Sequence, residues 1–468
     1  MPLILGAQSA VATGFSVDNS CRFNAGDSAV LSQSQSTSPT NDDICTMSLW
    51  FKPGNIDVDG SGFGFSGGDD ASNRFSVTLL GSAANNSLYL YGKVGGSLNL
   101  NLASARLFRD VSAWYHLVVA VDTTQGVEAS RVRCYINNEE VTLTGTFPSQ
   151  NDNCMLVKGG TFDLGCIRGG SWQQYNFTDG YMAEAILIDG QQLTPSSFGE
   201  ADEDSPTIWK PINVSGLTFG TNGFYMDFKD SSALGNDVSG NNNDFTATNL
   251  AAVDSSTDTP TNNFCTGNPI IHGGKLPTIS EGNCLFVSGG DWMHIPSTIG
   301  VANGKWYAEF KCVAKTGGQM MGVIDSGDIS GWGASPAAYV GNAPLGHCYQ
   351  DNGNKQTGDT ATSYGDTYTA GDIIGAALNA DDGEITFYKN NAVQASGTAI
   401  TLPTSTSSTG IWFWLPSVET GTIAANWGGC SAFAISSAAN DENGYGIFEY
   451  APPSDYLAIC TKNLATNG

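Results

Sequence analysis

The sequence contains few charged residues, and basic residues are especially scarce. Only 14% of the 468 residues are charged, and 19 Lys and Arg against 45 Asp and Glu give a formal net charge of −26. An acidic surface of this size repels phosphate backbones and anionic lipids. We therefore expect neither nucleic acid nor a membrane surface as a partner.

Long hydrophobic runs are also missing. No run is long enough to cross a bilayer, so we expect no membrane insertion. The first residues, MPLILGAQSAV, carry no basic residue, and we expect a chain made without a signal peptide. Sustained apolar spacing at i, i+3 and i+4 does not occur either, which argues against helical bundles.

The cysteines lack the spacing of a metal or redox site. Eleven are scattered along the chain and none forms a CxxC pair, which argues against a zinc or redox centre. We expect most of them to be buried free thiols made in a reducing cytoplasm, with disulfides as an alternative after release.

The chain is rich in glycine and in short strand patterns. There are 58 glycines, and alternating apolar segments occur at 45–51, 74–80, 88–91 and 114–121. Short strands joined by tight turns are typical of antiparallel sandwiches. We predict an all-β fold, and the length is sufficient for two domains.

Residues 180–200, GYMAEAILIDGQQLTPSSFGE, contain the clearest strand pattern. Two mostly apolar faces alternate, and they consist of Tyr181, Ala183, Ala185 and Leu187 on one side and Met182, Glu184, Ile186 and Ile188 on the other. Asp189-Gly190 then predicts a tight turn. Thr194 and Pro195 predict the N-cap and first residue of a short helical turn.

This strand, turn and one-turn helix resemble the closing segment of laminin-G-like (concanavalin A-like) jelly rolls. The wording of 180–200, followed by Trp209-Lys210-Pro211, resembles bacteriophage virion proteins that carry this domain. The segment Thr259-Pro260-Thr261-Asn262-Asn263-Phe264 resembles the same proteins.

One hairpin pattern occurs twice. RVRCYINNEEV at 131–141 and EITFYKNNAV at 384–393 each place Asn-Asn between two strands, and Asn tolerates the left-handed backbone of such a turn. Each follows a Trp-Tyr strand, at 114–115 and 306–307.

The second half resembles a SPRY domain, in GKWYAEF at 304–310, GDIIGAALNADDGEITFYKNN at 371–391 and PSVETGTIAANW at 416–427. We therefore predict two tandem concanavalin A-like β-sandwiches (jelly rolls), antiparallel and joined by a short linker. Residues 1–230 would form the laminin-G-like sandwich, the Asp/Asn/Thr-rich residues 231–275 the linker, and residues 276–468 the SPRY-like sandwich.

Concanavalin-like folds include glucanases, so an enzymatic function would require catalytic motifs in the sequence. Glycoside hydrolysis needs two carboxyls beside the scissile bond, and the Glu-x-Asp-x-x-Glu spacing of laminarinase-type enzymes does not occur. Glu184 is alone on its strand, and 200–204 is expected to be a solvated loop. The four histidines fall in no nucleophile or metal motif. We expect no catalytic residue.

Calcium is the one ion for which candidate ligands are present, and we expect no other cofactor. DVDG at 57–60 begins like a calcium loop, but its twelfth position is Gly68. Loop aspartates that could bind calcium, although they more often stabilise turns, are Asp69, Asp70, Asp230, Asp237 and Asp244.

Sugar binding would use exposed aromatic rings, which stack on the apolar face of a pyranose. Trp172 and Tyr175 in GGSWQQYNF, and Trp332 and Tyr339 in GWGASPAAYVG, have suitable Gly-rich or polar surroundings. The alternative is that these rings cap the sandwich edges or line an assembly interface.

The resemblance implies a bacteriophage virion surface protein of the fibre, knob or decoration type, made in the host cytoplasm. It would be non-enzymatic, would contact other virion proteins and would form a homo-oligomer, with a trimer as one possibility. Host-surface glycans would be its ligands. Two alternatives remain, a soluble carbohydrate-binding lectin and a polysaccharide-degrading enzyme of concanavalin-like fold.

Overall fold

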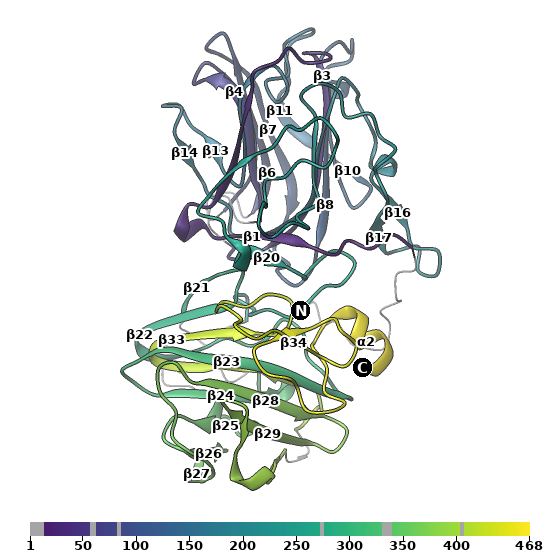
Figure 1. The fold of residues 1–468 in the computed structure, drawn as a ribbon. Coiled ribbons are helices and arrows are strands. Elements are labelled where there is room, and N and C mark those ends of the chain that lie inside the picture. The colour runs from purple at the N-terminus through teal and green to yellow at the C-terminus, as the bar shows by residue number, and fades with distance from the viewer. Residues whose placement is uncertain (1–13, 57–61, 82–85, 272–275, 330–338, 403–406) are drawn as a thin grey trace. The chain divides into compact units, whose positions relative to one another are not determined.

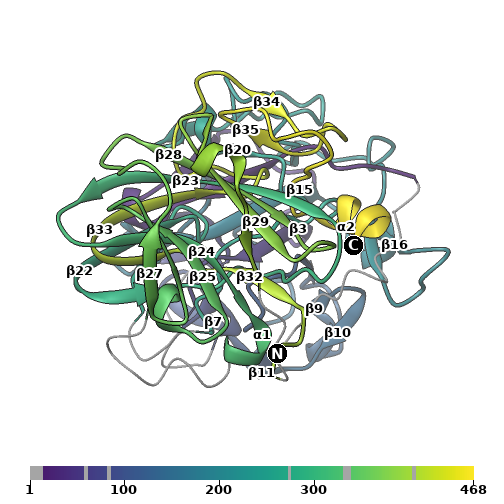
Figure 2. The ribbon, with the colours of Figure 1, turned by 90° about the horizontal axis from the view of Figure 1, so that it is seen from below.

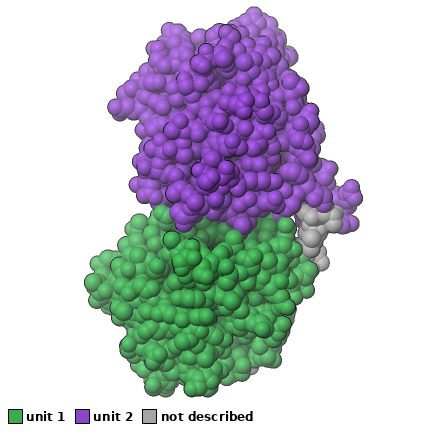
Figure 3. Space-filling model, in the orientation of Figure 1, with its two compact units in different colours: residues 1–11, 262–468 green, residues 12–261 purple. Residues whose placement is uncertain are grey.

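The computed structural model describes residues 14–56, 62–81, 86–271, 276–329, 339–402 and 407–468. They form two compact units: residues 12–261 make one, and the described residues of the other run from 262 to 468 (Figure 3). Strands dominate both, as predicted. Among the described residues, no helix is long and apolar enough to cross a membrane.

The first unit contains two antiparallel sheets of eight strands (Figure 1). Sheet A has the order β10-β9-β8-β3-β15-β1-β20, with β18 also on β15. Its strands are β1 (Ser20–Phe23), β3 (Ile44–Pro53), β8 (Tyr115–Asp122), β9 (Val132–Ile136), β10 (Glu139–Val141), β15 (Gly180–Asp189), β18 (Phe224–Met226) and β20 (Ser255–Ser256).

Sheet B has the order β11-β7-β6-β5-β4-β12-β2-β19. Its strands are β2 (Val30–Gln35), β4 (Gly64–Asp70), β5 (Asn73–Leu80), β6 (Ser87–Val94), β7 (Ser97–Leu107), β11 (Leu143–Thr146), β12 (Gly160–Leu164) and β19 (Thr246–Thr248). One hydrophobic core contains side chains of both sheets, including Leu49 of β3 and Val77 of β5. The predicted sandwich is therefore present.

The strand predicted within residues 180–200 is β15, which lies between β3 and β1 with every residue buried. Its predicted alternation is wrong in one respect. A bulge between Ala183 and Ile186, with Glu184 at φ 49°, shifts the phase of the strand. Met182 therefore shares the inter-sheet core with Ala185 and Leu187 and does not share a face with Ile186.

The helical turn after β15 is the 3-10 helix η3 (Pro195–Ser197), and Thr194 and Pro195 occupy the predicted positions. The Thr194 hydroxyl contacts Ser196 Oγ at 3.0 Å instead of capping a backbone N–H. The chain then pairs β16 (Gly199–Ala201) with β17 (Trp209–Pro211). Trp209 Nε1 donates to His116 Nδ1 at 2.9 Å, which attaches this segment to sheet A. Burial lowers the pKa of His116 to about 3, so its ring is neutral.

The predicted linker at 231–275 is not a separate segment among the described residues. β19 pairs with β2 and β20 pairs with β1, so residues up to 261 complete the first sandwich. From 262 onward the chain belongs to the second unit, where Phe264 bridges to Cys460 and Gly267 to Ser297. The segment is polar because many of its side chains form hydrogen bonds with backbone groups or ion pairs within the folded unit.

The second unit contains one hydrogen-bonded network of thirteen strands with the path β27-β26-β25-β24-β33-β23-β28-β29-β30 (Figure 2). These strands are β23 (Lys305–Lys315), β24 (Gln319–Asp325), β25 (Gly346–Gln350), β26 (Asn354–Thr357), β27 (Thr360–Ser363), β28 (Ile373–Asn379), β29 (Glu384–Lys389), β30 (Ala392–Val393) and β33 (Ser417–Asn426). β21 (Thr278–Ser280), β22 (Leu285–His294), β31 (Ile400–Thr401) and β32 (Trp412–Trp414) branch from it. Trp306, Trp414 and Trp427 fill the core.

Both predicted Asn-Asn hairpins are confirmed. β9 and β10 are joined by Asn137 and Asn138, at φ 48° and 68°. β29 and β30 are joined by Asn390 and Asn391, at φ 47° and 68°. Two successive left-handed residues define the turn whose twist matches that of the flanking strands.

A buried ion pair closes the first sandwich. Lys52 Nζ of β3 lies 2.7 Å from Asp258 Oδ2, and these side chains are 1% and 0% exposed. Trp114 Nε1 donates to the other carboxylate oxygen at 2.9 Å. The pair joins the centre of sheet A to the segment that follows β20.

We predict that Asp258→Ala lowers the free energy of unfolding of the first unit by about 3–5 kcal/mol, because it leaves the Lys52 ammonium buried without its partner. The double substitution Lys52→Met with Asp258→Leu should recover most of this loss. Glu139→Ala, which breaks the exposed pair with Arg106, is the matched control and should cost at most about 1 kcal/mol. Urea unfolding of the full chain measures all three, and equal losses for the buried and exposed pairs would contradict the prediction.

Candidate functional site

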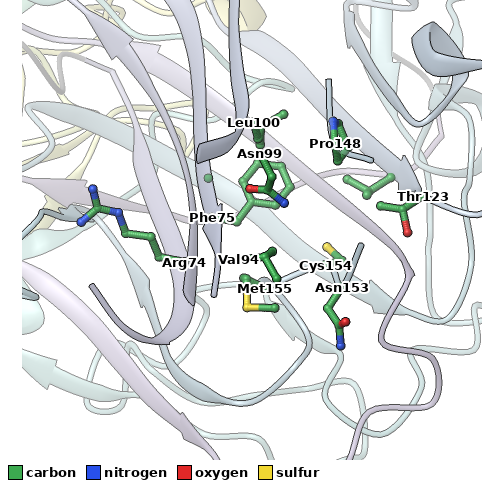
Figure 4. A pocket seen from close by; sticks show the side chains of 12 residues that line it. Arg74, Phe75, Val94, Asn99, Leu100, Thr123, Pro148, Asn153, Cys154 and Met155 are labelled. Carbon is green, nitrogen blue, oxygen red and sulfur yellow. The ribbon is translucent and has the colours of Figure 1, made fainter. Parts of the chain in front are cut away.

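The outer face of sheet B presents polar and aromatic side chains. On β5, Phe75, Val77 and Leu79 point into the core, so the alternation of a strand places Arg74 and Ser76 on the opposite face. Figure 4 shows the Arg74 side chain leaving the strand on the side opposite Phe75. The same alternation on β6 buries Leu88 and Leu90 and places Tyr89, Tyr91 and Lys93 outside.

The register of β5 and β6 brings these side chains together. Arg74 lies opposite Lys93, and Ser76 lies opposite Tyr91. The Arg74 guanidinium carbon is 4.9 Å from the centroid of the Tyr91 ring, which is cation–π distance. The rings of Tyr89 and Tyr91 are 6.4 Å apart. We call Arg74, Ser76, Tyr89, Tyr91 and Lys93 the β5–β6 face.

The β5–β6 face contains buried polar atoms without partners. Arg74 is 6% exposed, and its Nε and Nη1 atoms have no hydrogen-bond partner. Ser76 is 3% exposed, and its hydroxyl also lacks one. Such groups cost free energy unless water or a ligand satisfies them.

Arg74 differs from the other buried cations in the part of the chain that the structure describes. Arg22 pairs with Asp254 at 2.9 Å, Lys52 with Asp258 at 2.7 Å and Lys210 with Asp202 at 3.2 Å. No described carboxylate lies within ion-pair distance of Arg74, although acidic residues outnumber basic ones in the chain. A buried guanidinium without a carboxylate has the chemistry of an anion-binding group.

A hairpin borders the β5–β6 face. It consists of β13 (Ile167–Arg168) and β14 (Gln174–Tyr175), labelled at the flank of the first unit in Figure 1. The Arg168 guanidinium pairs with Asp163 of β12 and lies over the Trp172 ring, 5.2 Å from its centroid. The Arg168 N–H donates to Ser66 Oγ at 3.2 Å, which attaches the hairpin to β4.

Of the predicted sugar-binding pair in this unit, Tyr175 is 43% exposed, whereas Trp172 is half-buried against Arg168. Burial raises the pKa of Tyr89, and the phenols of Tyr91 and Tyr175 contribute to this shift, so the three tyrosines are neighbours. Sequence patterns singled out Tyr175 but missed Tyr89 and Tyr91. These two belong to an ordinary strand pattern, and only the pairing of β5 with β6 places them beside Arg74.

The other predicted pair is in the second unit. Trp332 lies outside the described residues. Tyr339 is half-buried, and its ring centroid lies 4.8 Å from that of Trp292. Its hydroxyl accepts a hydrogen bond from Gln356 Nε2 at 3.3 Å. Tyr339 therefore packs against Trp292 and hydrogen-bonds Gln356 within the second unit.

The five candidate calcium ligands do not converge on one site. Asp70 accepts hydrogen bonds from the backbone N–H groups of Ser72 and Asn73 at 2.7 and 2.9 Å, and Asp230 accepts one from Ser232. Asp237 and Asp244 lie together, but they accept backbone N–H groups of their own loop and of Tyr225 in β18. Asp69 is exposed. Among the residues that the structure describes, no three His, Cys, Asp or Glu side chains are grouped to hold a metal ion.

An open polar hollow lies at residues 35–42. Ser, Thr and Asn side chains line it together with Asp69, and Asp42 pairs with Lys158 at its wall. The Lys158 ammonium lowers the pKa of Asp42. Because its basic group already has a partner, the hollow has a weaker claim than the β5–β6 face to be a site for a charged ligand.

Two buried carboxyls have raised pKa values, and each is held within its own unit. Burial raises the pKa of Glu184 to about 7, and its Oε2 accepts the Tyr225 hydroxyl hydrogen bond at 2.6 Å. Burial likewise raises the pKa of Glu309 to about 7, and its oxygens accept the backbone N–H groups of Glu449 and Tyr450 at 2.8 and 2.9 Å. Glu184 is therefore a buried carboxyl hydrogen-bonded within sheet A.

Residues 24–197 match the family model described as the Concanavalin A-like lectin/glucanases superfamily. This match confirms the predicted concanavalin A-like fold for that part of the first unit, which includes the β5–β6 face. A search of curated proteins finds no match.

Solved structures similar to this chain include two human SPRY domains and a pentraxin. One human SPRY domain has 15% identity, covers 32% of this chain and 94% of its own, and gives a TM-score of 0.25. The SPRY domain of human HERC1 has 14% identity, coverages of 36% and 99%, and a TM-score of 0.27. A heptameric SAP-like pentraxin from Limulus polyphemus has 17% identity, coverages of 38% and 78%, and a TM-score of 0.29.

The raised pKa of Glu184 predicts a pH dependence of stability. Its ordinary value is 4.5, so between about pH 4.5 and 7 the folded unit holds a proton that the unfolded chain releases, and stability falls as pH rises through this window. Glu184→Gln keeps an acceptor for Tyr225 without the charge. We expect it to stabilise the first unit at pH 8 by on the order of 3 kcal/mol and to change it little at pH 4.

Urea unfolding of wild type and variant at pH 4, 6 and 8 measures this effect. Glu309→Gln is the matched control, because it should act on the second unit over the same pH range and leave the first unit unchanged. An unaltered pH dependence of the first unit in Glu184→Gln would contradict the prediction.

Proposed function

We propose that this chain is a non-enzymatic surface protein of a bacteriophage particle and that its first unit binds a saccharide bearing a carboxylate or sulfate. The observation that carries the ligand is Arg74, a buried guanidinium with no carboxylate partner, beside the unsatisfied Ser76 hydroxyl.

The chemistry of the β5–β6 face fits an acidic sugar. An arginine side chain binds a carboxylate or sulfate through parallel charge-assisted hydrogen bonds, and a serine hydroxyl can donate to a neighbouring oxygen. Tyr89 and the exposed Tyr175 offer ring faces to the apolar side of a pyranose. The net charge of −26 disfavours long polyanions such as nucleic acid, so the ligand is a short saccharide with an isolated anionic group.

The assignment to a virion is supported by the wording of residues 180–211 and 259–264, which resembles that of bacteriophage virion proteins. The sequence has no coiled-coil repeat, which favours a compact fibre tip, knob or decorating module over a long shaft. We propose other virion proteins and further copies of this chain, as in a trimer, as its partners, and host-surface glycans as the source of its ligand.

We predict that the full chain binds oligosaccharides containing a uronic acid more tightly than their neutral counterparts. Arg74→Gln should weaken this binding by about 10–100-fold, because it removes a charge-assisted interaction, and Tyr89→Ala should also weaken it through lost stacking. Arg106→Gln is the matched control, since Arg106 is on β7 of the same sheet but pairs with Glu139; it should bind like wild type.

Isothermal titration calorimetry measures these affinities, with circular dichroism to confirm folding. Equal affinity of wild type and Arg74→Gln for the acidic oligosaccharide would overturn the assignment of the ligand to the β5–β6 face. Release of reducing ends during incubation would favour the polysaccharide-degrading alternative.

We expect immunogold electron microscopy with an antibody to this chain to label purified particles. Label at the tail tip would support a role in receptor recognition, and label over the head would support decoration. Particles that carry no label in an infected culture producing the chain would contradict the virion assignment and favour the free lectin.

A further inference from the structure

All eleven cysteines are buried thiols, as the sequence predicted, but two of them are unusually close. The sulfur atoms of Cys45 and Cys154 are 2.7 Å apart. Elsewhere in the chain, the Cys348 and Met320 sulfur atoms are 3.6 Å apart, an ordinary non-bonded separation. The separation of the Cys45 and Cys154 sulfurs is shorter than this non-bonded separation and longer than the disulfide bond length of about 2.05 Å. The two thiols are therefore in position to react with each other.

The backbone around the two thiols is held by the fold. Cys45 is on β3, and its backbone pairs with Val121 of β8 and Asp189 of β15. Cys154 is in the loop after β11, where its N–H donates to Asp42 O at 2.6 Å, only three residues before Cys45. Asn153 Nδ2 donates to the Asp42 carboxylate at 2.9 Å and strengthens this attachment. The approach of the sulfurs therefore follows from several independent contacts.

A pocket provides a route to one of the sulfurs. Cys154 lies on the wall of a narrow pocket, with Thr123 and Met155 (Figure 4). Cys45 is completely buried behind it. Cys154 is thus the thiol that a small reagent can meet first.

We propose that Cys45 and Cys154 form a disulfide that links β3 to the loop carrying Cys154. The Cys154 thiolate attacks a low-molecular-weight disulfide such as oxidised glutathione, forming a mixed disulfide and releasing one glutathione thiolate. The Cys45 thiolate then attacks the Cys154 sulfur and releases the second. The two protein thiols lose two protons and two electrons, and the glutathione disulfide is reduced to two thiols.

The order of these steps follows from burial. Desolvation raises the pKa of Cys45, which makes its thiolate rare while the site is closed. The thiol on the pocket wall therefore reacts with the external disulfide, and Cys45 completes the bond inside the protein. This inference concerns the stability of the first unit and does not depend on the proposed ligand.

Peptide mapping tests the bond directly. The full chain is incubated with oxidised glutathione, unfolded in iodoacetamide and digested with trypsin, without reductant. Cys45 is then the only cysteine of peptide 23–74, because Lys52 precedes a proline, and Cys154 is in peptide 134–158 with Cys134. We expect these two peptides linked to each other, and the link should persist in Cys134→Ala. Recovery of both peptides with every cysteine alkylated would overturn the proposal.

A thermal measurement provides a second test. The bond would span 109 residues, and reduction should lower the melting temperature of the first unit by about 10 °C. Cys45→Ala and Cys154→Ala should each melt at the same temperature with and without reductant. Cys166→Ala removes another buried thiol and should keep the wild-type response. A wild-type melting temperature insensitive to reductant after oxidation would contradict the proposed bond.

Discussion

The first unit depends on the buried ion pair between Lys52 and Asp258. Two charges removed from water cost several kcal/mol each, and only close contact and further hydrogen bonds offset that cost. Here Trp114 Nε1 satisfies the second carboxylate oxygen, and the Ser20 hydroxyl binds the Asp258 carbonyl at 2.6 Å. The pair is therefore stable only when strands from both ends of the unit are in place. The segment that carries β20 and Asp258 is thus a structural part of the sandwich.

The scarcity of basic residues explains why Arg74 is unusual. The chain has 19 basic residues and 45 acidic ones, so a buried Lys or Arg side chain has many possible carboxylate partners. Arg22, Lys52 and Lys210 each pair with an aspartate, and the pairs of Arg22 and Lys52 attach segments more than 200 residues away. Arg74 pairs with no described carboxylate, and it lies over a tyrosine ring on the outer face of sheet B. The alternation that buries Phe75 in the core is what directs Arg74 to that face.

The two buried glutamates show how each sandwich holds an ionisable group through hydrogen bonds within its own unit. Glu184 occupies a bulge with a left-handed backbone and is bound by Tyr225. Glu309 receives two backbone N–H groups from the segment 449–450 and holds it against β23. Each carboxyl has hydrogen-bond donors of its own unit at hand, so both raised pKa values follow from burial within structural contacts.

The sequence by itself determined the features that depend on neighbouring residues. The all-β class, the strand at 180–189, Pro195 at the start of its helical turn and both Asn-Asn hairpins follow from alternation and local backbone preference, which act over a few residues. Only the tertiary structure decided what depends on distant pairing. The boundary at 261 arises from contacts such as that of Lys52 with a residue 206 positions away. The bulge at Glu184 appears only when β15 pairs with β3. Arg74 became a candidate because no described carboxylate pairs with it. Composition and residue spacing do not predict which charged side chains pair in the folded chain.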